Sequence, residues 1–87
     1  MKFKVTEDDI AKGVKGSHLS CPIARCINRT TGMLCSVRAS SVRIENGLGY
    51  YEHYLNNYKM EYFITDFDEG REVAPIEFEL SGGVLIK

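Results

Sequence analysis

The sequence predicts a small α+β domain, in which an antiparallel sheet of three to five strands carries its helices on one face. Two segments, about residues 20–31 and 57–69, repeat apolar residues at helical spacing and should form the two main helices. Several shorter segments alternate polar and apolar residues, which is typical of strands. The chain has 87 residues, 44% of them hydrophobic, so residues 1–87 should form a single domain with one core.

The N-terminal segment predicts a short strand followed by a short helix. Residues 2–5 alternate polar and apolar side chains, and the apolar ones should face the core. Thr6 stands three residues before Asp9, the spacing of a capping box, so a helix of one or two turns should begin there. We expect Ile10 and Val14 to point into the core from this segment.

The first main helix, about residues 20–31, has signals at its start and on both faces. Ser20 is the expected N-cap, and Pro22 falls in the first turn, where its missing N–H costs nothing. Arg25 and Arg29 lie one turn apart on the outward face, where they meet solvent or a partner. The inward stripe at helical spacing consists of Ile23, Cys26, Ile27 and Thr30.

A β-hairpin is expected after this helix. Residues 34–39 and 42–45 both alternate polar and apolar side chains, with Ser40 and Ser41 as the turn between them. Arg38 and Arg43 fall on the polar positions of the two strands. They should therefore point away from the core from neighbouring strands.

The second main helix follows an aromatic segment. Asn46 and Gly47 predict a turn, after which residues 50–54 form either a third strand or an aromatic loop. Asn56 is the expected N-cap of the helix over about residues 57–69, and Tyr62 should lie on its exposed side. Its buried stripe should consist of Met60, Phe63, Ile64 and Phe67.

The last part of the chain predicts one further strand. Residues 76–80 alternate charged and apolar side chains, and Pro75 marks the start or the edge of this strand. Residues 81–87 contain two glycines followed by three apolar residues. We expect this segment to be either an added edge strand or a mobile tail.

The charges are distributed very unevenly. Residues 10–44 contain no Asp or Glu, although the chain as a whole has a net charge of −1. That near-neutral total argues against bulk non-specific DNA binding. A merged patch of the four arginines Arg25, Arg29, Arg38 and Arg43 would instead predict a site for a nucleotide or another small anion. The alternative is a solvated face, neutralised within the fold by the acids of residues 61–79.

Tyrosines form a second cluster of interest, since all five tyrosines of the chain lie within residues 50–62. Tyrosine is enriched at protein interfaces because its ring is apolar and its hydroxyl is polar. Core packing with the hydroxyl at the surface explains several of the five. Tyr58 and Tyr62 are the two that we expect to contact a partner.

The cysteines invite two chemical hypotheses. His18, Cys21, Cys26 and Cys35 could supply zinc ligands, but the spacing is not a standard one. Cys21 and Cys26 would lie about 140° apart around a helix and would not converge. We therefore expect core cysteines and no bound metal or other cofactor. Cys21 also sits at a helix N-terminus near His18, which leaves a cysteine-dependent enzyme as a distant alternative.

The sequence also bears on where the protein acts. Met1 to Lys4 run into the acids of residues 7–9 with no apolar leader segment, and no apolar run is long enough to span a bilayer. Three cysteines do not imply a disulfide framework. We expect a cytoplasmic chain with reduced thiols.

A set of short motifs is spread along the chain: Lys4-Val5-Thr6, Gly13-Val14, Gly16-Ser17, Cys21-Pro22-Ile23-Ala24, Phe63-Ile64, Phe67-Asp68, Gly70, Pro75 and Phe78-Glu79-Leu80. In these motifs the chain resembles a group of small uncharacterised bacteriophage and prophage proteins. The resemblance spans about residues 2–80, with little match at residues 50–54. The group has no assigned activity, so no functional residue is carried over. The resemblance implies a phage-encoded accessory protein in the cytoplasm of the bacterial host.

These observations support a ranked set of functions. The first is a binding protein without catalysis that contacts a host protein or complex, such as a defence or regulatory factor. The second is a small-anion or nucleotide-binding protein that uses the arginines. The third and most distant is the cysteine-dependent enzyme.

Overall fold

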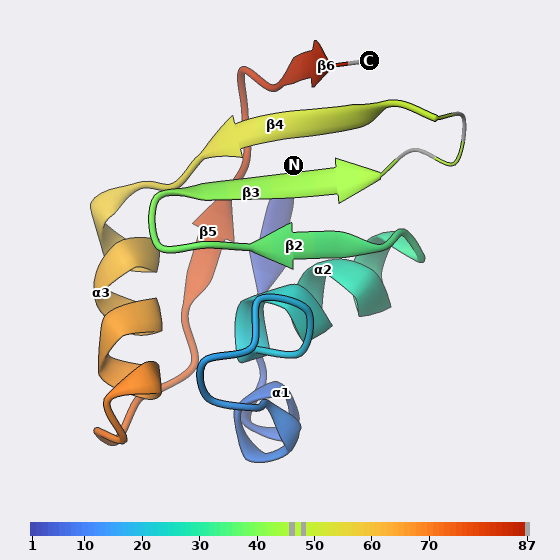
Figure 1. Ribbon diagram of the computed structural model, residues 1–87. Coiled ribbons are helices and arrows are strands. Elements are labelled where there is room, and N and C mark those ends of the chain that lie inside the picture. The colour runs from blue at the N-terminus through green and yellow to red at the C-terminus, as the bar shows by residue number, and fades with distance from the viewer. Residues whose placement is uncertain (46, 48, 87) are drawn as a thin grey trace.

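In the part of the chain that the structure describes, three helices and two antiparallel sheets make up the fold (Figure 1). The computed structural model describes residues 1–45, 47 and 49–86. The elements in chain order are β1 (Lys2–Lys4), α1 (Glu7–Lys12), α2 (Pro22–Thr31), β2 (Cys35–Val37), β3 (Ser41–Glu45), β4 (Tyr51–Leu55), α3 (Tyr58–Asp68), β5 (Glu77–Glu79) and β6 (Val84–Ile86). The larger sheet has the strand order β2-β3-β4-β6, and β1 pairs with β5 in a separate two-stranded sheet.

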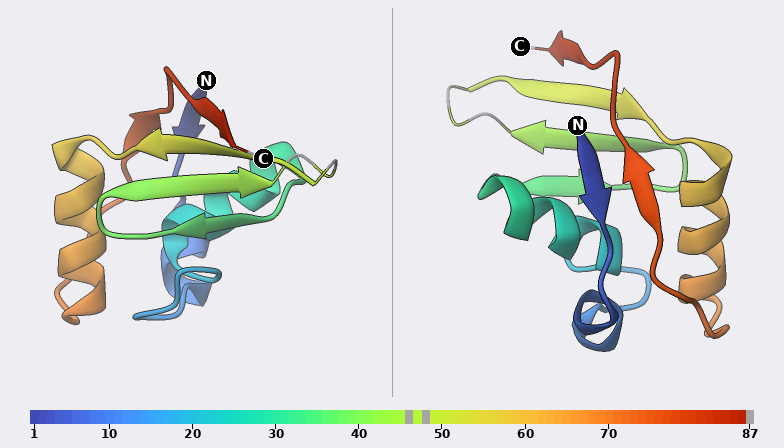
Figure 2. Two further views of the ribbon diagram at one scale, coloured as in Figure 1. Left: turned by 45° about the horizontal axis from the view of Figure 1, so that its top comes forward. Right: turned by 180° about the vertical axis from the view of Figure 1, so that it is seen from behind.

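The elements form layers around one core. Seen from behind, α2 and the β1–β5 sheet lie across one face of the four-stranded sheet, and α3 lies at one end of its strands (Figure 2). No described element covers the opposite face of that sheet. The α+β class, the antiparallel sheet and the helices on one face are therefore confirmed. The separate pairing of β1 with β5 is an addition that the sequence did not predict.

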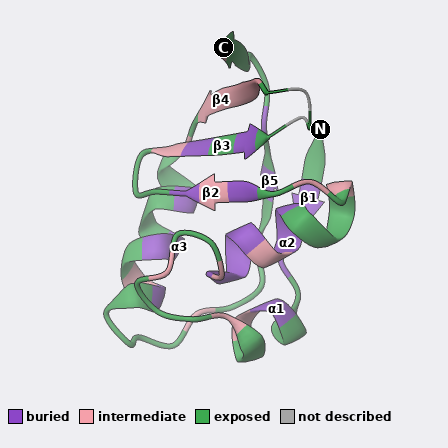
Figure 3. Cartoon of the chain, turned by 45° about the vertical axis from the view of Figure 1, so that its right-hand side comes forward, coloured by how far each residue is buried: buried purple, intermediate pink, exposed green. Residues whose placement is uncertain are grey.

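The core lies between the four-stranded sheet and the layer behind it (Figure 3). The predicted stripe of α3 is buried, and Tyr62 is exposed, as expected. Phe3 of β1 stacks on Phe78 of β5 with ring centroids 5.1 Å apart, and both rings are buried, so the small sheet contributes to the core. The largest fully buried apolar side chains are Phe3, Ile23, Ile27 and Met60.

Both main helices begin one residue later than the sequence predicted. The N-cap of α2 is Cys21 rather than Ser20, and its Sγ accepts a hydrogen bond from the Ala24 N–H at 3.4 Å. Thr30 is exposed, because the buried stripe of α2 ends at Ile27. The short α1 starts as predicted, with a capping box between Thr6 and Asp9.

The N-cap of α3 is Asn57 rather than Asn56. Asn57 Oδ1 accepts a hydrogen bond from the Met60 N–H at 2.9 Å. The side chain of Asn56 instead donates to the carbonyl oxygens of Arg38 and Ala39, at 2.8 and 3.2 Å. Asn56 therefore ties the chain before α3 to the β2–β3 turn, a contact between distant residues that a local capping pattern does not reveal.

Two further predictions need correction. Val14 is exposed, because α1 ends at Lys12 and Gly13 leaves the helical conformation. Arg38 lies beyond the end of β2, in the turn before β3. The predicted turn at Asn46 lies outside the described residues.

The two segments left open by the sequence both form strands. Residues 50–54 largely fall in β4, which pairs with β3 over its whole length. The tail contributes β6, an edge strand antiparallel to β4. The chain reaches this edge through Gly83, where an added Cβ would lie 2.5 Å from Cζ of Tyr54. Only a glycine allows the backbone to pass so close to that ring.

Candidate binding surfaces

The four predicted arginines do not form one surface. Arg25 and Arg29 belong to α2, which lies behind the four-stranded sheet (Figure 2). Arg43 belongs to β3 and is exposed between the buried Val42 and Ile44, so it points to the opposite side of that sheet. Arg38 lies in the turn between β2 and β3. The sheet thus separates Arg43 from the two arginines of α2, and Arg38 lies apart from Arg25 and Arg29 in the turn at the end of the hairpin.

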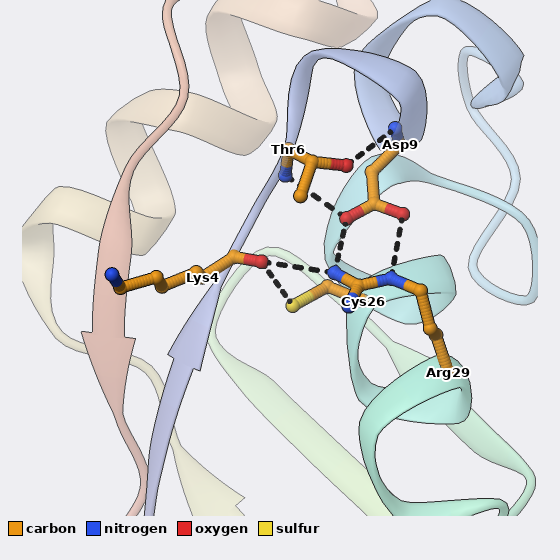
Figure 4. Close-up of polar contacts among 5 residues, drawn as sticks. All are labelled: Lys4, Thr6, Asp9, Cys26 and Arg29. Carbon is orange, nitrogen blue, oxygen red and sulfur yellow. Dashed lines mark hydrogen bonds and ion pairs between the residues drawn. The ribbon is translucent and has the colours of Figure 1, made fainter.

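Arg29 is used inside the fold (Figure 4). Its Nη2 lies 2.8 Å from Asp9 Oδ2 in an ion pair, and it also donates to the carbonyl oxygen of Lys4 at 3.0 Å. Asp9 is only 2% exposed, and its carboxylate also accepts a hydrogen bond from the Thr6 N–H at 3.0 Å. One guanidinium therefore joins α1, α2 and the end of β1. Its charge is neutralised by an acid of α1 and not by those of residues 61–79.

The environment of Asp9 keeps its carboxyl group ionised. Burial alone would raise the pKa of Asp9. The hydrogen bonds from Arg29 and Thr6 and the charge of Arg29 outweigh burial, so the pKa lies below its ordinary value of 3.8. A buried carboxylate of this kind needs its cation, and we therefore regard Arg29 as structural.

Arg25 is the free member of the helix pair. It is half-buried, and no described residue forms an ion pair or a hydrogen bond with its side chain. Its Nε is shut off from solvent without an acceptor. A hollow of about 440 Å³ lies here, which we call the arginine hollow; its lining residues are Asp9, Leu19, Ser20, Arg25, Asn28, Arg29 and Leu34.

Arg38 lines a different hollow, of about 270 Å³, which also contains the residue types of a cysteine-dependent enzyme. Cys21, His18 and Asp68 line the same hollow. Cys21, however, is buried and serves as the N-cap of α2. Burial raises the pKa of its thiol, and the negative charge of Asp68 raises it further. The thiolate that a nucleophile requires is therefore disfavoured.

The other two cysteines are also core residues. Cys26 Sγ donates to the carbonyl oxygen of Lys4 at 3.1 Å, and Cys35 Sγ donates to that of Ala24 at 3.3 Å. Burial raises the pKa of both thiols, that of Cys35 to about 12. All three cysteines are free thiols. Among the described residues, no group of three or more His, Cys, Asp or Glu side chains could hold a metal ion.

The uncovered side of the four-stranded sheet, which we call the open face, combines apolar and charged side chains. The Arg43 guanidinium lies over the ring of Tyr51, 4.0 Å from its centroid. His53 stands opposite Arg43 in the register and Val84 opposite His53, so the three form one row across the sheet. Leu55 ends β4 on the same side and is 78% exposed. Glu45 is exposed on the same side of β3 and stands opposite Tyr51 in the register, so the open face is defined by Arg43, Glu45, Tyr51, His53, Leu55 and Val84.

Tyr58 and Tyr62 are both exposed on α3, one turn apart. Their rings contact edge to face, with centroids 6.2 Å apart. Such a pair on a helix surface presents a rigid aromatic area to a partner. Leu55 precedes Tyr58 by three residues, so the tyrosine pair begins close to where the open face ends.

Two features were missed by sequence reasoning. The leucines of the arginine hollow, Leu19 and Leu34, lie in loops outside any periodic segment. The apolar part of the open face was missed as well, although the alternation of residues 51–55 could have shown that Leu55 shares a face with Tyr51.

The chain matches no protein-family model, no curated protein and no solved structure. Within the described residues, no helix has the length and apolar character needed to cross a membrane.

Proposed function

We propose that this chain is a protein-binding module without catalysis, and that its open face docks on a partner protein carrying acidic side chains among apolar ones. The observation that carries the proposal is that only one of the two faces of the four-stranded sheet is packed against other elements. One face packs against α2 and the small sheet, whereas no described element covers the other (Figure 2).

The chemistry of the open face supports a protein partner. Arginine and tyrosine dominate the energetics of many interfaces, because both present large flat surfaces that lose little conformational freedom. Here the two are already stacked, Arg43 on Tyr51. Leu55 and Val84 add exposed apolar area that would leave water on contact.

The unpaired guanidinium of Arg43 supports an acidic group on the partner. No carboxylate of the described residues forms an ion pair with Arg43. An acidic side chain of a partner would therefore find a guanidinium that is fixed by its stacking on Tyr51 and free to bind it. Tyr58 and Tyr62 would extend the contact along α3.

The biological setting is also part of the proposal. We propose a phage-encoded accessory protein that acts in the cytoplasm of the bacterial host on a host protein or complex, such as a defence or regulatory factor. This part rests on the sequence resemblance. A non-catalytic role is supported by the three buried thiols with raised pKa values.

Photo-crosslinking tests the proposed docking face. Leu55 would be replaced by benzoylphenylalanine, and the chain irradiated in bacterial lysate at physiological salt. We expect a defined covalent adduct to one protein, identified by mass spectrometry. The matched control carries the same replacement at Ala11, which is exposed on α1 far from the open face in the sequence.

Charge reversal completes the test. Arg43→Glu should abolish the Leu55 adduct while lowering the melting temperature only slightly, because Arg43 is exposed, forms no ion pair with a described residue and loses only its stacking on Tyr51, worth about 0.5–1 kcal/mol at an exposed site. Equal adducts from Leu55 and Ala11, or an adduct that survives Arg43→Glu, would show that the partner does not dock on the open face.

A further inference from the structure

We infer that the arginine hollow binds a small carboxylate carried on an apolar group, with Arg25 as the anion-binding residue. This site is separate from the open face, because α2 lies on the other side of the four-stranded sheet (Figure 2). The inference depends on neither the proposed partner nor its docking face.

The first argument is the state of the Arg25 side chain. Its Nε is closed off from solvent and has no acceptor. The two Nη nitrogens, by contrast, remain accessible to solvent. A buried stem holds the guanidinium in place, so binding would cost little side-chain entropy. A carboxylate can reach the two Nη nitrogens end-on and form a bidentate pair.

The second argument is the local balance of charge. Three ionised side chains line the arginine hollow: Asp9, Arg25 and Arg29. Asp9 and Arg29 neutralise each other at 2.8 Å, which leaves the single positive charge of Arg25. One carboxylate would balance that charge. A phosphate dianion would bring a second negative charge close to the carboxylate of Asp9, with no second free cation to receive it.

The third argument is the apolar rim. Leu19 and Leu34 line the hollow and are 63% and 68% exposed, so they present apolar surface side by side with Arg25 at the same site. They supply apolar contact for the body of a ligand whose carboxylate lies on Arg25. The volume of about 440 Å³ is within the range of small-molecule sites.

Phenylacetate is a suitable probe, because it combines one carboxylate with one ring. In a titration followed by NMR, we expect saturable shifts of the Arg25 Nε–H signal and of the methyl groups of Leu19 and Leu34. Phenylacetamide, which has the same shape without the charge, should produce no saturable shift. Inorganic phosphate should bind more weakly than phenylacetate.

Variants assign the site. Arg25→Gln should weaken phenylacetate binding about tenfold or more, which corresponds to the loss of one charged pair. Arg38→Gln is the matched control, because Arg38 lines the other hollow, and it should leave binding unchanged. Leu19→Asp provides a second variant on an exposed loop position, where the added negative charge should repel the carboxylate.

Several results would overturn the inference. These are the absence of saturable shifts with phenylacetate, equal binding of phenylacetamide, or a folded Arg25→Gln or Leu19→Asp variant that binds as tightly as the unchanged chain. Tighter binding of inorganic phosphate than of phenylacetate would also overturn the assignment to a carboxylate.

Discussion

At the residue scale, the decisive feature is a buried carboxylate with a half-exposed partner. Asp9 is 2% exposed, whereas about half of the Arg29 side chain is accessible to solvent. The sequence predicted the capping box of Asp9, because Thr6 and Asp9 are three residues apart. It could not predict that Arg29 pairs with Asp9, because that contact depends on how α1 packs on α2.

Arg29→Gln should lower the free energy of unfolding by roughly 2 kcal/mol at neutral pH, because it leaves the Asp9 carboxylate buried without its cation. Partial exposure of Arg29 keeps this loss below that of a fully buried pair. Urea unfolding would measure it. The matched control Arg38→Gln should stay within about 0.5 kcal/mol of the unchanged chain, since Arg38 is exposed.

The loss should also depend on pH, with a definite sign. In the unchanged chain the pKa of Asp9 is lower in the folded state than in the unfolded state, where it is about 3.9. The stabilisation of the fold by ionised Asp9 is therefore fully present above the unfolded-state pKa and is lost as pH falls through the folded-state pKa. Without Arg29, burial would raise the pKa of Asp9. The difference in free energy of unfolding between Arg29→Gln and the unchanged chain should therefore shrink as pH falls from neutral toward about 4, because Asp9 of the variant becomes protonated. A difference that does not change with pH would contradict this account.

The thiols provide a second prediction at this scale. All three cysteines are buried and their pKa values are raised, so iodoacetamide at neutral pH should label none of them in the native protein. Labelling of all three should require urea, which mass spectrometry would show. Rapid labelling of native Cys21 would contradict the assignment of this thiol as a cap and would favour the cysteine-dependent enzyme.

At the scale of the elements, the sequence predicted the type of most segments and misplaced their ends. Helices α2 and α3 match their predicted ranges to within two residues, because their apolar stripes are regular. Their N-caps were each placed one residue early. Ser20 and Asn56 are good capping residues by type, but tertiary contacts decide which of two neighbours caps, as the bonds of Asn56 to the β2–β3 turn show.

Gly83→Ala should detach or weaken β6, because the new Cβ would overlap the ring of Tyr54. The Tyr54 hydroxyl donates a hydrogen bond to Glu52, which keeps the ring from turning aside freely. We expect a loss of about 1–2 kcal/mol, within the range for an overpacked site.

Hydrogen exchange would locate that effect. Amides of β6 and their partners in β4 should exchange faster in Gly83→Ala, while those of β2 should not change. Ser81→Ala is the control, since Ser81 is exposed. Unchanged exchange in β6 would mean that the chain passes Tyr54 by another path.

At the scale of the whole molecule, the sequence predicted the class but not the arrangement of its parts. Alternation and helical periodicity can be read within single segments of the sequence, and they show which side of each strand and helix is buried. They therefore sufficed to predict the antiparallel sheet and the helices on one face. The separate β1–β5 sheet depends on contacts between residues far apart in the chain, such as Phe3 with Phe78. For the same reason, the sequence could not show that the sheet separates Arg43 from Arg25 and Arg29.

The layers predict an order of local stability. β3 lies between two hydrogen-bonded neighbours, and its Val42 and Ile44 are buried. β6 is an edge strand of three residues with two exposed apolar side chains. In native-state hydrogen exchange, the slowest amides should therefore lie in β3, and those of β6 should exchange much faster. Equal protection of the two strands would contradict a core centred on β3.

The ion pair between Asp9 and Arg29 has a thermodynamic consequence for α1. This helix has six residues, too few to persist without tertiary support. Both members of the pair also line the arginine hollow. If a ligand in the hollow changes the equilibrium between ordered and frayed α1 by some factor, then ordering of α1 changes the affinity for that ligand by the same factor. Fraying of α1, followed through its amides, would therefore report on ligand binding even at residues of α1 that do not line the hollow.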